Sequence, residues 1–268
     1  MVFVLKQIVN YKLNIMIKKI TFFLLLTLSL NTFSQKKIKG NGLVSVVKTD
    51  LNDFKKLSIN NDFEVVLIKS STPSIEIETD ENIHEAIKFY VSDSVFTLDC
   101  SSKLKPKKTF NITIFCTEKL TEIELNNNAK LETINTLNFS SMALEINNYA
   151  KADVTIKSDD FKFISNSQSK IQLRPKSKLD IESKLINFDI EDASSTEAIV
   201  RTDSLTLNLK DKGSLEIQGN TETLNIAAIG HSKVKGKNLV AKKSFVVVSD
   251  DASISTQTFD DILSLIHI

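Results

Sequence analysis

From Ile123 onward, short runs of alternating apolar and polar residues recur at a nearly constant interval. In each run a small residue follows six positions after the first apolar residue, and the alternation then resumes. The spacings between successive small residues are 21, 19, 25, 19, 19 and 20 residues. A fixed period of this length indicates a repeat architecture. The small residues are Ala129, Ala150, Ser169, Ser194, Gly213, Ser232 and Ala252.

The residue content of these runs favours strands over helices. Apolar residues recur with a period of two, β-branched and Phe residues are frequent, and Asn, Asp or Ser stands at the breaks. One unit is too short to bury its own apolar side, so neighbouring units must stack and share a core. The sequence therefore predicts an all-β fold, a β-solenoid with about seven coils of roughly 20 residues after an irregular, β-rich N-terminal part.

The small residues are expected to lie at a corner of each coil. Side chains stacked at a sharp turn face each other at the strand spacing of about 4.8 Å, which leaves room only for Ala, Ser or Gly. Asn and Asp precede the small residue, tolerate the left-handed conformation and can form amide ladders when stacked. We interpret the column as turn chemistry, with an exposed functional stripe as the alternative. The turn residues are Asn126–Asn128, Asn147, Asn148, Asn166, Asp192, Asp211 and Asp250.

The N-terminal part shows alternation without a clear period. Asp80 is expected to cap a short helical turn that carries Ile83, Ala86 and Ile87 on one side. The basic segment 103–108 is expected to be a solvated linker. Since no domain linker is evident, residues 35–262 are predicted to form a single domain. Strands are predicted at 54–59, 63–68, 74–78, 95–100 and 110–116.

The beginning of the chain has the pattern of a secretory signal peptide. Lys18 and Lys19 precede an apolar run from Ile20 to Leu30, and small residues before Gln35 suit signal peptidase. We therefore expect residues 16–34 to be removed and the protein to be exported to the periplasm, the cell surface or the medium. Residues 1–15 are predicted to be upstream translation, with Met16 as the true start.

The last residues, 263–268, read Leu-Ser-Leu-Ile-His-Ile. This is the translation of CTG TCT CTT ATA CAC ATC, which resembles the mosaic-end adapter of transposase-made sequencing libraries. We expect native sequence to stop near Ile262; an apolar last strand is the alternative. Without residues 1–34, which hold four Lys and no acid, the balance changes from 34 basic and 33 acidic residues to 30 and 33, or −3.

Composition excludes several classes of function. Near-neutral charge gives no reason to expect nucleic acid as a partner, and no membrane span is expected after signal cleavage. Two Cys and three His make a thiolate or His-rich metal site unexpected, and we predict no cofactor and no metal. Cys100 and Cys116, both on the apolar side of predicted strands, form either a buried thiol pair or a disulfide between stacked coils.

The opening of the mature chain, Gly40 to Ile83, resembles the DUF2807 family of secreted Bacteroidota domains (auto-transporter adhesin, head GIN domain). The resemblance rests on Gly40-Asn-Gly42, Phe54-Lys-Lys-Leu-Ser-Ile59 and Glu64-Val-Val-Leu-Ile68. It extends over nearly all of the mature chain and implies a right-handed, single-stranded β-helix with an adhesin-like role. Two features depart from the family: the glycine-rich turns have changed to Asn-Asn-Ala and similar segments, and the closing strand is absent.

No residues in the sequence are assigned a catalytic role. The acidic pairs Asp159-Asp160, Asp189 with Asp192 and Asp250-Asp251 stand at turns, where solvated Asp is usual. Arg174 and Arg201 do not neighbour an acidic cluster in their own repeats, and His84 and His231 are expected at the surface. A β-helical carbohydrate-active enzyme therefore stays the alternative to a non-enzymatic binding protein, and a structural spacer is a second alternative.

The favoured hypothesis is a binding domain that presents a repetitive polar surface to glycan or to an envelope or surface protein. Repeated side chains on a rigid rod bind by avidity. Tyr149, beside a repeat corner, is a weak candidate for stacking on a sugar ring. A true autotransporter is disfavoured because no C-terminal run of amphipathic membrane strands follows.

Overall fold

The computed structural model describes residues 37–166 and 176–267, nearly all of which belong to the compact unit that begins at Ile38. Its N-terminal elements are β1 (Lys37–Lys39), β2 (Val44–Asp50), β3 (Lys56–Ile59), β4 (Glu64–Lys69), β5 (Ser74–Asp80), the 3-10 helix η1 (Glu81–Ala86), β6 (Lys88–Ser92), β7 (Val95–Asp99), β8 (Lys103–Lys105) and β9 (Phe110–Cys116). The later strands are β10 (Glu122–Leu125), β11 (Lys130–Thr133), β12 (Leu137–Asn138), β13 (Ser141–Asn147), β14 (Lys151–Asn166), β15 (Lys176–Ile190), β16 (Ser195–Leu209), β17 (Ser214–Ala228), β18 (Lys233–Ser249) and β19 (Ser253–His267). The predicted all-β class is confirmed.

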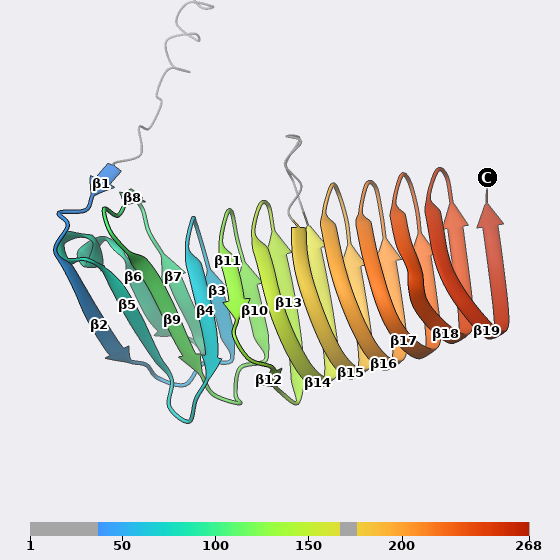
Figure 1. The fold of residues 1–268 in the computed structure, drawn as a ribbon, viewed down its shortest axis with the longest axis horizontal. Coiled ribbons are helices and arrows are strands. Elements are labelled where there is room, and N and C mark those ends of the chain that lie inside the picture. The colour runs from blue at the N-terminus through green and yellow to red at the C-terminus, as the bar shows by residue number, and fades with distance from the viewer. Residues whose placement is uncertain (1–36, 167–175, 268) are drawn as a thin grey trace, which may run out of the picture. The chain divides into compact units, whose positions relative to one another are not determined.

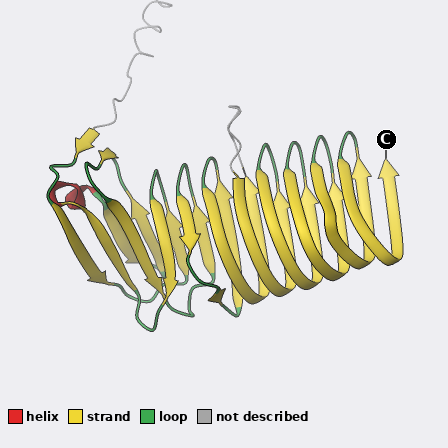
Figure 2. Ribbon diagram, viewed as in Figure 1, coloured by secondary structure: helices red, strands yellow, loops and turns green. Residues whose placement is uncertain are grey.

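Strands β14 to β19 stack in parallel, each pairing with the next along the chain. Figure 1 shows them as successive turns that bend in the middle of each strand, with loops at one end, and Figure 2 shows how little of this part is loop. Equivalent residues form continuous columns. One such column is buried, and each of its members pairs with the next: Phe163, Phe188, Leu207, Ile226 and Val246. The core is therefore a continuous apolar interior shared by neighbouring turns.

The N-terminal strands belong to the same stack but follow a different order. β3 pairs in parallel with β7 on one side and with β10 on the other, and β4 likewise lies between β9 and β11. Lys56 therefore faces Glu122, a residue 66 positions later, and the two side chains form an ion pair at 2.6 Å. The stack thus begins before Ile123, where the sequence period becomes visible. Antiparallel strands β2, β5 and β6 close this end.

Each long strand, or pair of short strands, that makes one turn of the stack is called a rung. The loops between successive rungs are tight turns that contain the predicted Asn and Asp residues. Left-handed φ values occur at Asn127 (62°), Asn148 (60°), Asp192 (56°), Asp211 (56°) and Asp250 (58°). Asx side chains tolerate this region because they bond locally to the backbone. A ladder of amides also runs across three rungs. It consists of Asn147 donating to Asn126 at 3.1 Å and Asn126 donating to Asn60 at 3.0 Å.

The small residues that follow these turns lie inside the stack. Ala129, Ala150, Ser194 and Ser232 are at most 1% exposed, and Ala252 is half-buried. A Cβ on Gly213 would lie 2.7 Å from the carbonyl oxygen of Ile190 in the preceding rung. Carbonyl groups of these residues accept N–H groups of the next rung, as Ser194 does from Ser214 at 2.9 Å. Ser169 falls outside the described residues.

The bend in the middle of each long strand has its own polar column, which the sequence interpretation did not identify. Ser158, Ser183, Thr202 and Thr221 are buried there. Thr202 donates its hydroxyl to the carbonyl of Lys184 or of Ser204, each at 3.0 Å. The Thr202 hydroxyl thus satisfies a carbonyl that the bend exposes inside the stack, whereas the Ser158 hydroxyl has no partner among the described residues.

Asp80 locks the N-terminal segment onto the end of the stack. It stands at the start of η1, but its side chain makes no capping bond and instead accepts the backbone N–H of Gly42 and that of Lys107, the latter at 2.8 Å. The expected capping role was therefore wrong. A Cβ on Gly40 would collide with the carboxylate. The segment predicted as a solvated linker in fact opens with β8, which pairs with β1.

We expect Asp80→Asn to lower the melting temperature at pH 7 by roughly 5 °C, because the amide nitrogen would face N–H donors. The N–H groups of Lys107, Gly42 and Lys108 hold the pKa of Asp80 below its ordinary value, although burial opposes them. A lowered folded-state pKa stabilises the fold above the unfolded value, about 4, and this contribution is lost as pH falls below it.

Melting curves of the wild type and the variant between pH 3 and pH 7 test this. Their difference should be constant above about pH 5 and should shrink below about pH 4. Glu81→Gln, which changes an adjacent exposed carboxylate, is the control and should leave the curves together. A pH-independent difference would contradict the role assigned to the Asp80 charge.

Candidate functional site

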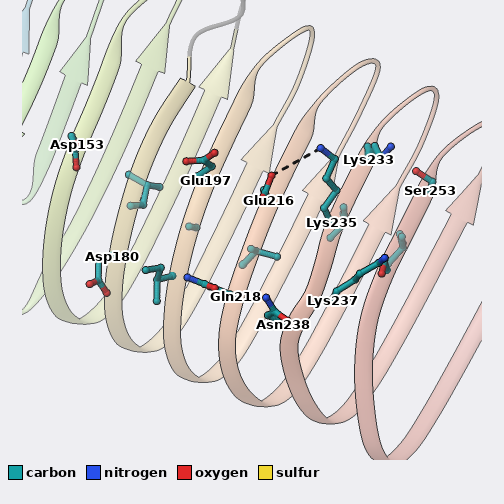
Figure 3. A pocket seen from close by; sticks show the side chains of 17 residues that line it. Asp153, Asp180, Glu197, Glu216, Gln218, Lys233, Lys235, Lys237, Asn238 and Ser253 are labelled. Carbon is teal, nitrogen blue, oxygen red and sulfur yellow. Dashed lines mark ion pairs between the residues drawn. The ribbon is translucent and has the colours of Figure 1, made fainter.

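A groove lies on the outer surface over the first halves of β14 to β19, with a volume of about 980 Å³. Two columns of outward side chains form its floor and walls, as Figure 3 shows. In each column a residue pairs with the equivalent residue of the next strand. One column consists of Glu197, Glu216, Lys235 and Ser255, and the other of Asp180, Ile199, Gln218 and Asn238. The alternation of each strand directs every second residue outward, so the parallel register alone aligns these groups.

A β-bulge underlies the groove at β17 and β18. The register between these strands shifts between Glu216 and Gln218, which pair with Lys235 and Asn238. Gly219 has φ of 127°, and a Cβ there would overlap the carbonyl oxygen of Val200 in the neighbouring strand. Bulges bend a strand and redirect its side chains, and a Gly inside a strand marks such a point.

The charges of the groove are unequally compensated. Asp180 pairs with Arg201 at 2.5 Å, and Glu216 contacts Lys235 at 4.0 Å. Lys233 and Lys237 are exposed on β18, and neither makes an ion pair with a side chain in the part of the chain that the structure describes. The β18 side of the groove is therefore electropositive.

Two further cavities are smaller. One, of about 580 Å³, lies at the strand bends, where Lys157 pairs with Glu182 at 2.5 Å and Lys184 with Asp159 at 2.8 Å. These four charges are thus already paired with one another. The other, of about 430 Å³, lies over β4, β5 and β9 and has Ile134 at its edge.

The acidic clusters considered as catalytic candidates have structural partners. Asp159 forms its ion pair with Lys184, and Asp189 accepts a hydrogen bond from Asn208 at 2.8 Å. Asp251 contacts His231 at 3.1 Å between two exposed side chains. The structure thus does not join these clusters into one site. Arg174 falls outside the described residues, and Arg201 lines the cavity at the strand bends and pairs with Asp180.

One serine–histidine contact occurs at the N-terminal end. Ser45 Oγ lies 3.1 Å from Nε2 of His84, which joins β2 to η1. Within the described ranges no ion pair of His84 with a carboxylate is present, and His84 does not line any of the three cavities described above. A nucleophile and base need an orienting group and an oxyanion site as well. The contact therefore serves to attach β2.

The remaining candidate residues lie away from the groove. Tyr149 is half-buried in the turn between β13 and β14, where its N–H bonds to Asn127 at 2.7 Å. Cys100 and Cys116 are buried free thiols. Cys116 pairs with Lys69 at the end of β4, whereas Cys100 follows β7, which pairs with β3 before β4 begins. This places the thiols at opposite ends of β4, which disfavours the disulfide of the two alternatives. Burial raises the pKa of Cys116 to about 11.

Within residues 37–166 and 176–267, no group of three His, Cys, Asp or Glu side chains is arranged to hold a metal ion. The same ranges contain no helix of the length and apolarity that crossing a membrane requires.

Comparison with solved structures identifies proteins that share this fold. A "putative adhesin" of Bacteroides fragilis superposes with a TM-score of 0.61 at 16% identity, covering 86% of this chain and all (100%) of its own. A "putative lipid binding protein" of Parabacteroides distasonis gives 0.57 at 13%, covering 87% and 99%. A "putative adhesin" of Parabacteroides merdae gives 0.53 at 17%, covering 87% and 98%. At these identities the likeness establishes the fold alone.

Sequence comparison agrees with the resemblance predicted from Phe54–Ile59 and Glu64–Ile68. No curated protein matches the chain. A family model does match, over residues 53–178, a narrower range than the predicted one, and Gly40-Asn-Gly42 lies outside it. The matched range runs from the segment before β3 into β15. Over this range the chain carries the pattern of DUF2807, the family described as "Putative auto-transporter adhesin, head GIN domain".

Proposed function

We propose that this chain is an exported, non-enzymatic binding protein of adhesin type that contacts glycan or protein through the groove over β14 to β19. In this proposal residues 16–34 direct export to the periplasm or cell surface, and residues 35–262 form a right-handed solenoid of about seven coils. The small residues at the turns keep adjacent coils in contact. The family match and the adhesin neighbours support the binding role.

The observation that carries the proposal is the groove itself. Its outward residues come from six successive strands and stand in register, so their positions are set by the backbone hydrogen bonds of the stack. A rigid, pre-formed site loses less entropy on binding than a flexible one. Its exposed side chains are carboxylates, amides, hydroxyls and ammonium groups, with Ile199 the exposed large hydrophobic residue among them. Such a lining favours a polar partner over a lipid tail.

Ile199→Trp should fill the groove and abolish partner binding without changing stability, because the outward side chain at this strand position does not enter the core. Thr206→Trp is the control; it lies on the same strand beyond the bend and also points outward. Binding to immobilised glycans and to whole cells measures the effect. Equal binding by both variants would contradict a role for the groove and favour a structural spacer, and glycan cleavage by the wild type would favour the enzyme.

A further inference from the structure

The chemical class of the groove's ligand can be inferred from the charges that the protein leaves uncompensated. Asp180 and Glu216 have cationic partners, and Glu197 has an interaction partner as well. Asp153 lies on β14, four strands from β18 and thus on the order of 19 Å away at the usual strand spacing. Lys233 and Lys237, by contrast, lie together on one strand. The uncompensated charge near β18 is therefore positive.

The two ammonium groups are separated along the groove. Four residues of extended chain span up to about 13 Å, and the bulge at Gly236 shortens this distance. One sugar ring does not reach across this span, but a chain of several does. Between and beside them, Gln218, Asn238 and Ser253 offer amide and hydroxyl groups (Figure 3). Such groups exchange hydrogen bonds with the hydroxyls of sugars.

The lining distinguishes a glycan from an acidic segment of protein. Protein partners anchor on aromatic and large apolar side chains in closed pockets. None of the residues that line this groove is aromatic, and Ile199 is the exposed large hydrophobic residue among them. Hydrogen-bonding groups outnumber apolar anchors, which suits a polyhydroxylated chain.

We propose that the groove binds an acidic oligosaccharide, with Lys233 and Lys237 holding two of its carboxylate groups and the amide column holding its hydroxyls. This inference rests on the proposed binding function of the groove. The ammonium groups gain charge-assisted hydrogen bonds to carboxylate oxygens. Because the lysines are exposed, the attraction is screened by salt and decreases at high ionic strength.

Titration with short oligogalacturonates tests the inference, with the carboxyl-reduced form of the same oligosaccharides as the neutral probe. The acidic form should bind and the neutral form should not. Lys233→Gln with Lys237→Gln should weaken binding about tenfold, as expected for the loss of two exposed charge contacts. Lys103→Gln with Lys105→Gln, which removes two exposed charges from β8, should leave binding unchanged.

Three outcomes would overturn the inference. They are equal binding of both probes, unchanged affinity in the groove variant, and lysine-dependent binding of oligoglutamate as tight as that of the oligogalacturonate. The Ile199→Trp variant separates these failures from failure of the proposed function. If it abolishes binding to cells while the lysine variant does not, the groove is the binding site and its ligand is not acidic glycan.

Discussion

Gly219→Asn is expected to destabilise the protein by about 3 kcal/mol or more, whereas Gly230→Asn should change its stability by less than about 1 kcal/mol. Both glycines have positive φ, but they occupy different regions of backbone conformation. Gly219, at 127°, lies in a region that side chains avoid, and its Cβ would overlap the carbonyl of Val200. Gly230, at 75°, is in the left-handed region that Asn127 and Asn148 occupy in equivalent turns.

Urea unfolding followed by circular dichroism measures both variants. A lower midpoint with an unchanged slope for Gly219→Asn would locate the effect in the folded state. Since Gly219 directly follows Gln218, which lines the groove, the variant should also lose binding under conditions where it is still folded. Similar midpoints for the two variants would contradict the assignment of strain to this position.

Phe188→Ala is expected to cost about 3–5 kcal/mol, the usual loss when a fully buried ring leaves a cavity. The ring is fully buried and packs edge-on against Phe163, with centroids 5.2 Å apart, and against Phe161 at 6.3 Å. Each rung is stabilised by its neighbours, so the cavity weakens two interfaces at once.

Phe245→Ala provides the matched control. Phe245 lies on β18, is 47% exposed and points away from the shared interior, so its removal should cost about 1 kcal/mol. Thermal and urea unfolding of both variants give the comparison. If Phe245→Ala were as damaging as Phe188→Ala, the outward surface rather than the shared column would hold the rungs together.

The repeated part of the fold was predictable because its signals are local. Asp211 and Asn127 stand where a turn needs a left-handed residue, and a small residue follows each of them two positions later. The alternation of apolar and polar residues predicted the strands, and the constant period predicted that the strands stack. The second polar column had a local signal too, since Thr202 and Thr221 each follow the small turn residue by eight positions.

The N-terminal order was not predictable from the sequence. β3 pairs with residues 39 positions later in β7 and 66 positions later in β10, and alternation does not specify which strand becomes the partner. Asp80 looked like a helix cap because its partners, Gly42 and Lys107, are distant in sequence. Strand partners at such distances depend on tertiary packing rather than on local propensity.

The groove could not be located from the sequence, because its position depends on a β-bulge and on the register in which the strands pair. Gly219 and Gly236 were the available signal, since a Gly inside an alternating run indicates a bulge. Lys233, Lys235 and Lys237 look in the sequence like an ordinary solvated face. Only the pairing of β17 with β18 reveals that one of them is matched by an acid of the preceding rung.

The position of β3 and β4 between later strands has a consequence for folding as the chain emerges with its N-terminus first. Rungs from β15 onward need only the preceding rung, so each can add as soon as about twenty residues emerge. Lys56–Lys69, however, stays without neighbours on both sides until β7, β9, β10 and β11 have been made. Closing these distant pairings carries a loop entropy that local rungs avoid. The N-terminal end is therefore expected to be the slowest part to fold, and the emerging chain is most exposed to misassociation before Thr133 becomes available for pairing.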